Sequence, residues 1–322
     1  MPGNFWKDKR VFVTGISGFV GSRLALRLIK EGAYVVGLTR NLAKVPTPLH
    51  DIPIFIGDIC DADLVRSIIS YEEIDIIYHL AANAIVRSSA KDPLSTYKTN
   101  VMGTANLLEA ARQVGVRKII VASSDKAYGD HDKLPYMDTH ALQPKNTYDT
   151  SKACMDMISR SYAYNYDMNI VVTRCSNIYG PGDMNLSRLI PNTIKRSLDG
   201  KPAMIYSDIS NMEREFIYID DVVEAYCTLG LSHENHYLPS VNIGGSGPKK
   251  ILEVVNKIRE ICNSELEPEV VPREPRFKEI QKQYIDASRM AELGWEPTTS
   301  LDEGLRRTVE WYTKYYKDGE YS

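Results

Sequence analysis

The feature that most constrains the fold is an alternation of short apolar segments with segments of helical periodicity in the first half of the chain. The apolar runs are VFVTG, YVVGLTR, IPIFIGD, DIIYHLA and KIIVASS, and the first helical pattern begins near Phe19. Apolar strands that alternate with helices are typical of a parallel sheet with both faces covered. We therefore expect an α/β fold with a doubly wound parallel sheet.

The second half of the chain has a looser pattern. With 322 residues, the chain exceeds the length at which one core usually keeps growing. Prolines interrupt shorter elements after Arg174, at Pro181, Pro191, Pro202, Pro239, Pro248, Pro268, Pro272, Pro275 and Pro297. We expect a smaller α/β lobe there.

Composition and charge argue against several classes of protein. The hydrophobic fraction of 43% and the charged fraction of 25% are ordinary for a soluble protein, and a net charge of -3 disfavours a nucleic-acid binder. No signal-peptide pattern and no apolar run of membrane-spanning length is present, so we expect a cytoplasmic location and no membrane partner. Five widely spaced cysteines and the lack of a CxxC pair suit reduced thiols, and no metal site is expected.

A glycine-rich segment, VFVTGISGFVGS, lies between the first strand and the first helix. It contains Gly15, Gly18 and Gly21, where bare backbone can approach a pyrophosphate at a helix N-terminus. The G-x-x-G-x-x-G spacing is one residue longer than the usual dinucleotide fingerprint, and glycines also form ordinary strand-to-helix turns. Its position after an apolar strand favours a dinucleotide cofactor.

The end of the second strand bears on which dinucleotide binds. GLTRN has Thr39 and Arg40 where a carboxylate would bind the ribose 2′-hydroxyl of NAD. A guanidinium suits a 2′-phosphate, so the sequence favours NADP, with NAD as the alternative. A solvated surface arginine would also explain Arg40.

A tyrosine and a lysine four residues apart indicate a reactive centre. In NTYDTSKACMDM, Tyr148 and Lys152 lie on one face of a predicted helix. A nearby ammonium favours the phenolate that a tyrosine needs to act as a base. The pair alone is common on helices, but together with the glycine segment it is specific.

At this point the chain resembles the extended short-chain dehydrogenase/reductase superfamily of nucleotide-sugar enzymes. The resemblance runs nearly end to end and includes TGISGFVG, GDICD, YHLAA, NVMGTANLLEAAR, VASSDKAYG, YDTSK, RCSNIYGPG, REFIYIDDVV, VNIGG and LGWEPTTSLDEGLRRTVEW. It implies an NADP-binding Rossmann domain over residues 1–176, completed by segments near 215–232, and a nucleotide-sugar-binding lobe over residues 177–322.

The resemblance also implies roles for individual residues. Ser124 would hydrogen-bond the sugar near its 4-hydroxyl, Tyr148 would remove that proton, and Lys152 would hold the nicotinamide ribose. The implied cofactor site consists of Gly15, Ser17, Gly18, Phe19, Val20, Thr39, Arg40, Asp58, Ile59, Leu80, Ala81, Ala82, Tyr148 and Lys152. The implied substrate site consists of Asn177, Arg188, Leu189, Tyr206, Arg214, Asn242 and Arg276.

The pair Asp125-Lys126 in SSDKAYGD distinguishes the candidate reactions. A solvated turn would explain both charges, but the pair follows the strand KIIVASS, and ligands bind beyond the carboxyl ends of such strands. Similar 4-epimerases usually carry small uncharged residues here, dTDP-glucose 4,6-dehydratases carry Asp-Glu, and CDP-glucose and UDP-N-acetylglucosamine 4,6-dehydratases carry Asp-Lys. The resemblance implies that Asp125 is the acid toward the 6-hydroxyl and Lys126 the base at C5.

The sequence therefore predicts an NADP-dependent nucleotide-sugar 4,6-dehydratase, a lyase that forms a 4-keto-6-deoxy sugar nucleotide. UDP-N-acetylglucosamine is the expected substrate, and CDP-glucose, dTDP-glucose and GDP-mannose stay open. A UDP-sugar 4-epimerase and a catalytically idle NADP-binding module are the alternatives. Helices around 93–113 and 148–166 resemble those that pair across a two-fold axis, so we expect a homodimer or a larger homo-oligomer, although the same residues would suit packing within one chain.

Overall fold

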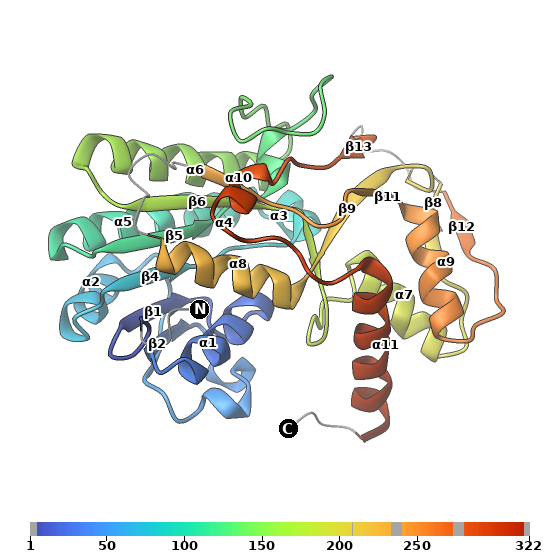
Figure 1. Ribbon diagram of the computed structural model, residues 1–322, viewed down its shortest axis with the longest axis horizontal. Helices are drawn as coiled ribbons and strands as arrows, with labels where there is room; N and C mark the ends of the chain where they lie inside the picture. The colour runs from blue at the N-terminus through green and yellow to red at the C-terminus, as the bar shows by residue number, and fades with distance from the viewer. Residues whose placement is uncertain (1–4, 208, 233–239, 273–279, 319–322) are drawn as a thin grey trace.

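The larger part of the molecule is built on a seven-stranded parallel sheet (Figure 1). The computed structural model describes residues 5–207, 209–232, 240–272 and 280–318. The strands are β1 (Arg10–Thr14), β2 (Tyr34–Thr39), β3 (Ile54–Ile56), β4 (Ile76–His79), β5 (Lys118–Ala122), β6 (Ile170–Cys175) and β10 (Ser240–Ile243). Their order is β10-β6-β5-β4-β1-β2-β3, which confirms the doubly wound Rossmann arrangement.

Helices cover both faces of this sheet, because successive strand residues point to opposite sides. Val11 and Val13 of β1 pack with Leu24 of α1, whereas Phe12 between them packs with Leu107 of α5. The helices of the first face are α1 (Phe19–Lys30) and α8 (Ile219–Leu231), and those of the second are α2 (Ala62–Tyr71), α5 (Gly103–Val114) and α6 (Thr147–Tyr166). Burial on both faces explains why the strands are apolar throughout.

Short helices lie in the connections that follow the strands of the larger sheet. They are η1 (Leu42–Lys44), η2 (Thr47–Leu49), α3 (Val86–Lys91), α4 (Pro93–Tyr97), the π-helical turn η3 (Lys98–Met102) and η4 (Asp125–Tyr128). The last of these follows β5 directly and contains both residues of the Asp125-Lys126 pair.

The second part is a smaller α/β lobe (Figure 1). Its strands are β7 (Asn177–Tyr179), β8 (Met204–Tyr206), β9 (Glu213–Tyr218), β11 (Pro248–Lys250), β12 (Glu269–Val271) and β13 (Lys282–Gln283). β9 pairs with β7 and β13 in parallel and with β11 in antiparallel, while β8 pairs with β12. The helices are α7 (Leu189–Leu198), α9 (Ile251–Ile261) and α11 (Leu301–Asp318), and the short α10 (Ser288–Glu292) contacts β10 of the larger sheet.

The course of the chain between the two parts differs from the expected boundaries. β9 belongs to the sheet of the smaller lobe, so the return of the chain to the larger domain begins with α8, within the expected segment near 215–232. The return also extends past residue 232, because β10 pairs with β6 and buries Val241 and Ile243 in the same core as α8.

A buried histidine lies where β1, β4 and α5 meet. His79 is 0% exposed, with Nδ1 at 2.8 Å from Thr14 Oγ1 and Nε2 at 3.0 Å from Thr104 Oγ1. Burial, together with the charge of Lys152, lowers the pKa of His79 from 6.5 to about 3. The imidazole is therefore neutral across the physiological range, and its two hydroxyl partners fit that state.

We predict that His79 makes the folded protein sensitive to acid. The unfolded imidazole binds a proton below pH 6.5, whereas the folded one does not until about pH 3. This contribution to stability is complete above pH 6.5 and falls by about 1.4 kcal/mol per pH unit below it. Urea unfolding of the wild type and of His79→Gln at successive pH values measures the effect. A difference between the two proteins that is independent of pH would contradict the prediction.

Candidate active site

The glycine segment lies against the end of β4. Gly15 has a φ of +73°, and a Cβ at this position would lie 2.9 Å from the backbone nitrogen of Ala81. A Cβ at Gly21 would collide with the carbonyl oxygen of Gly15. The lack of side chains thus lets the loop, the first turn of α1 and the segment after β4 approach one another, which is the kind of backbone cradle that a pyrophosphate needs.

The ends of β2 and β3 adjoin the same loop. The hydroxyl oxygens of Ser17 and Thr39 are 2.8 Å apart. Arg40 follows Thr39 and is exposed. A hydrogen bond from the Cys60 backbone lowers the pKa of Asp58, and the charge of Arg40 lowers it further. Since these residues share the carboxyl edge of the sheet, the residues present fit a dinucleotide.

The other predicted cofactor residues surround this edge. The backbone nitrogens of Leu80 and Ala81 both donate to Thr14 Oγ1 at 3.2 Å. Phe19 and Val20 form the first turn of α1, and Ile59 is buried beneath Gly103. Gly18 caps α1, and Ala82 follows Ala81 at the end of β4.

The predicted catalytic residues come together between β5 and α6. Ser124 is the N-cap of η4, and its Oγ accepts from Lys126 N at 3.2 Å and donates to Asp125 Oδ1 at 3.1 Å. Tyr148, at the start of α6, is 8% exposed and hydrogen-bonded to Ser124. Lys152 lies one turn further along α6 and donates from Nζ to the carbonyl oxygen of Ala122 at 2.7 Å. The structure thus gathers all five into one site.

Burial dominates the electrostatics of the Tyr148-Lys152 pair. Burial and the charge of Asp149 raise the pKa of Tyr148, whereas the charge of Arg188 and the hydrogen bond with Ser124 oppose the rise. Burial lowers the pKa of Lys152 to about 8. The phenol therefore retains its proton in this state, and further positive charge beside it would favour the phenolate.

Asp125 and Lys126 do not form a solvated turn. Asp125 is 1% exposed, and its Oδ2 has no hydrogen-bond partner within the described ranges. Lys126 Nζ lies 3.6 Å from Asp125 Oδ1 and 3.1 Å from Asn177 Oδ1. A buried carboxylate oxygen without a partner is costly unless a ligand supplies one.

A buried polar network that the sequence did not predict holds η4 in place. Arg174 on β6 pairs with Asp156 on α6 through contacts of 2.7 and 3.0 Å, and its Nη1 donates to Tyr128 Oη at 2.8 Å. Tyr128 in turn donates to Asn242 Oδ1 at 2.7 Å. The signals were an arginine within the apolar strand IVVTRC and an acidic residue one turn beyond Lys152 on the same helix face.

Asn242, which the sequence predicts to bind substrate, belongs to the same network. Its amide is 1% exposed, and Nδ2 donates to the carbonyl oxygens of Tyr136 and Asp286 at 2.9 Å. With Tyr128 on its oxygen, Asn242 is engaged by three protein groups and contributes to the framework of the site.

Glu215 on β9 is a second buried residue that was missed. It is 2% exposed, and its carboxylate accepts from the backbone nitrogens of Gly247 and Ile285 at 3.1 Å. Burial raises the pKa of Glu215 to about 7, and the nearby charge of Asp125 adds to the rise. Its place on the same strand face as Ile217 was the available signal.

The other predicted substrate residues lie on the smaller lobe. Arg188 donates to Asp183 Oδ2 at 2.9 Å, and its positive charge opposes the rise in the pKa of Tyr148. Leu189 is the first residue of α7. Arg214 donates to the carbonyl oxygen of Glu213 at 2.9 Å, and its charge opposes the rise that burial causes in the pKa of Tyr136. Tyr206 ends β8, and Arg276 lies outside the described residues.

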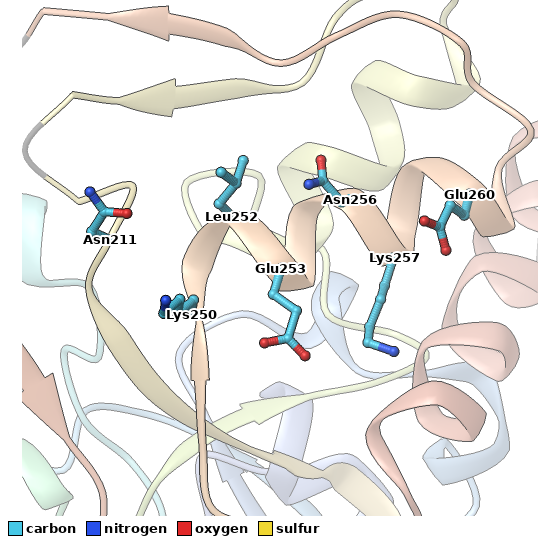
Figure 2. A pocket seen from close by; sticks show the side chains of 7 residues that line it. All are labelled: Asn211, Lys250, Leu252, Glu253, Asn256, Lys257 and Glu260. Carbon is cyan, nitrogen blue, oxygen red and sulfur yellow. The ribbon is translucent and has the colours of Figure 1, made fainter.

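A separate surface hollow of about 490 Å³ runs along α9 (Figure 2). It is lined by Asn211, Lys250, Leu252, Glu253, Asn256, Lys257 and Glu260, and it includes none of the predicted site residues.

Among the described residues, no helix has the length and apolar character to cross a membrane. In the same part of the chain, no group of three His, Cys, Asp or Glu side chains could hold a metal ion.

Residues 12–308 match the family model described as GDP-mannose 4,6 dehydratase. The chain belongs to this family. Its relatives are nucleotide-sugar 4,6-dehydratases and epimerases of the extended short-chain dehydrogenase/reductase superfamily, so the expected resemblance is confirmed. The family is one of enzymes whose 4,6-dehydratase members are hydro-lyases.

Three similar proteins illustrate the members of this family. A trifunctional UDP-glucose 4,6-dehydratase/UDP-4-keto-6-deoxy-D-glucose 3,5-epimerase/UDP-4-keto-L-rhamnose-reductase of Arabidopsis thaliana is 34% identical over 96% of this chain, which spans only 48% of the plant protein. The UDP-glucose 4-epimerase of Thermotoga maritima, solved with UDP-glucose, is 29% identical with a TM-score of 0.87, covering 95% of this chain and 99% of that one. The dTDP-glucose 4,6-dehydratase of Streptomyces venezuelae, solved with NAD, is 28% identical with a TM-score of 0.86, covering 96% and 98%.

Proposed function

We propose that the protein is a nucleotide-sugar 4,6-dehydratase. The observation that carries this proposal is the buried Asp125, whose Oδ2 lacks a partner in the described structure, beside Lys126 and the Ser124-Tyr148 pair. Oxidation at C4 needs only Ser124, Tyr148 and Lys152. A buried acid and an adjacent amine are the additional groups that elimination of water requires.

Each side chain has one task in this scheme. The bound cofactor supplies the acceptor, and then the donor, of a hydride. Tyr148 takes the 4-hydroxyl proton as C4 becomes a ketone, with Ser124 hydrogen-bonded to the same oxygen. Lys126 takes the acidified C5 proton, and Asp125 gives a proton to the 6-hydroxyl, which leaves as water as the C5–C6 double bond forms. C6 would then take up a hydride, which a bound dinucleotide would supply, and C5 would take up a proton, which would leave the cofactor unchanged overall.

We propose UDP-N-acetylglucosamine as the substrate. The Asp125-Lys126 pair supports this choice over dTDP-glucose, and two of the similar proteins are named for UDP-glucose, which supports a uridine base. Arg188 and Arg214 on the smaller lobe supply cations that suit a diphosphate. UDP-glucose, CDP-glucose, dTDP-glucose and GDP-mannose are the competing substrates in the test.

A UDP-sugar 4-epimerase is the second candidate, favoured by the similarity to the Thermotoga maritima enzyme. In that reaction the hydride returns to C4 on the opposite face of the sugar. Asp125 and Lys126 would then have no chemical task, which leaves the buried and unpartnered Oδ2 of Asp125 unexplained.

The two candidates predict different products and different effects of mutation. Mass spectrometry of products from a panel of nucleotide sugars should show the loss of one water, whereas a stereoisomer of unchanged mass would indicate an epimerase. Asp125→Asn with Lys126→Ala should still reduce the bound cofactor but slow the release of water by at least about 100-fold. Asp130→Asn with Lys133→Ala, an exposed acid and base after η4, is the control. Undiminished release of water by the first double variant would refute the roles of Asp125 and Lys126.

We further propose that the cofactor is NADP. The exposed guanidinium of Arg40 at the end of β2 supports a 2′-phosphate there, while the solved relatives with NAD favour the alternative. Arg40→Ala should weaken NADP binding by about 10- to 100-fold, the value of a charge-assisted hydrogen bond, and leave NAD binding unchanged. Titration calorimetry measures both, with the exposed Lys44→Ala as the control. Release of NAD alone from the denatured wild type would refute this assignment.

We also propose that the chain forms a homodimer or larger homo-oligomer through α4, η3, α5 and α6. Large apolar side chains on these elements are exposed: Leu94 is 77% exposed, Met102 55%, Met157 58% and Tyr164 90%. Light scattering should give at least twice the chain mass of 36.4 kDa. Met157→Glu with Tyr164→Glu, seven residues apart on one face of α6, should give monomers. A wild-type monomer would refute the proposal.

A further inference from the structure

A chain of side-chain hydrogen bonds crosses the larger domain between η3 and β1. It begins at the backbone carbonyl oxygen of Asn100 in η3, to which Thr104 Oγ1 donates at 2.5 Å. Thr104 Oγ1 lies 3.0 Å from Nε2 of His79, and Nδ1 of the same ring lies 2.8 Å from Thr14 Oγ1. The chain therefore connects η3 and α5 to the ends of β4 and β1.

The end of this chain at η3 determines the tautomer of His79. A backbone carbonyl can only accept, so Thr104 Oγ1 uses its proton on Asn100. The Thr104 oxygen must then accept from Nε2 of His79, which therefore carries a proton. In a neutral imidazole this leaves Nδ1 as an acceptor.

The other end of the chain gives the same tautomer independently. Thr14 Oγ1 accepts from the backbone nitrogens of Leu80 and Ala81, both at 3.2 Å. These two bonds use both lone pairs of the hydroxyl oxygen, so Thr14 is the donor in its bond with Nδ1 of His79. Burial lowers the pKa of His79 to about 3, which agrees with a neutral ring.

Thr14 Oγ1 joins the two walls of the predicted dinucleotide site. Thr14 ends β1 and directly precedes Gly15, while Leu80 and Ala81 follow β4. The walls lie close together, since a Cβ on Gly15 would be 2.9 Å from the backbone nitrogen of Ala81. If Nδ1 of His79 carried the proton, three donors would compete for the two lone pairs of Thr14, and one of the backbone bonds would be lost.

We propose that His79, held as the Nε2-protonated tautomer, is a positioning residue that orients the Thr14 hydroxyl and so keeps the two walls of the dinucleotide site together. Thr104 selects this tautomer. Since His79 is 0% exposed, it acts through Thr14 and not by contact with a ligand. This inference rests on the proposed dinucleotide cofactor and applies to either candidate reaction.

Nitrogen NMR of the wild type tests the tautomer without cofactor or turnover. In protein with isotopically labelled histidine, the His79 ring should show a protonated Nε2 and an unprotonated Nδ1 near neutral pH. The chain has six histidines, and His79→Gln identifies the ring by the loss of its signals. A protonated Nδ1, or a mixture of the two tautomers, would overturn the inference.

Thr104→Val removes the hydroxyl that selects the tautomer and keeps the shape of the side chain. The His79 ring should then show a detectable Nδ1-protonated fraction. Affinity for NAD or NADP, measured by titration calorimetry, should fall by about tenfold, the value of one hydrogen bond. Thr308→Val is the matched control, because Thr308 is also buried and donates to the carbonyl oxygen four residues earlier, but lies on α11 of the smaller lobe. Unchanged affinity in Thr104→Val would contradict the positioning role.

Two variants of His79 separate positioning from a purely structural role. His79→Asn retains an acceptor near the place of Nδ1, whereas His79→Gln retains a donor near the place of Nε2. Each loses one buried hydrogen bond, so both should unfold at lower urea concentration than the wild type. Dinucleotide affinity should be about tenfold lower in His79→Gln, because only that variant leaves the Thr14 hydroxyl without its acceptor. Equal affinity in the two variants would indicate a purely structural role and overturn the proposal.

A measurement without ligand separates failure of this inference from failure of the proposed cofactor. A wild type that binds neither NAD nor NADP would refute the cofactor. Amide hydrogen exchange at Leu80 and Ala81 still reports the bonds to Thr14, and it should be about tenfold faster in His79→Gln than in His79→Asn. Equal exchange in the two variants would overturn the positioning role.

Discussion

The buried ion pair between Arg174 and Asp156 is the interaction on which the arrangement of the site depends. Both side chains are 1% exposed or less, and Nη1 of Arg174 also donates to Tyr128 Oη and to the carbonyl oxygen of Asp138. Loss of one partner from such a pair costs about 3–5 kcal/mol, because it leaves a buried charge without compensation. The pair fixes α6 against β6, and α6 carries Tyr148 and Lys152. Through Tyr128 the same guanidinium fixes η4, so Ser124 and the Asp125-Lys126 pair share a common support with Tyr148 and Lys152.

The larger domain could be predicted from the sequence because burial on both faces makes each of its strands apolar, and that is a local property. The strands of the smaller lobe could not be predicted from the sequence in the same detail. Its strands have two to six residues, and β9 pairs with β7, β11 and β13, which come from distant parts of the chain. The residues of β9 do not predict which strands pair with it. For the same reason the return of β10 to the larger sheet was not foreseen.

The site shows the same division between local and distant information. The glycine loop and the spacing of Tyr148 and Lys152 are local patterns, and the structure brings them to one edge of the sheet. Asn242 was expected to contact substrate, but it is covered by Tyr128, Tyr136 and Asp286, which lie far from it in the sequence. Arg174 and Glu215 look like ordinary charged residues in strands until their partners are known. The environment of a charge depends on neighbours that only the fold assembles.

The position of Lys126 shows how one scaffold can support two reactions. Ser124, Tyr148 and Lys152 are the residues to which the proposed function assigns oxidation at C4, the step that dehydratases and epimerases share. All three belong to the larger domain. Asp125 and Lys126, which the proposed elimination uses as acid and base, lie within one turn of η4. A flexible lysine is a poor base unless something holds its amine, and the acceptor in this structure comes from β7 of the other lobe. The two parts of the molecule therefore meet at the amine of Lys126, because the acceptor of that amine belongs to a strand of the smaller lobe.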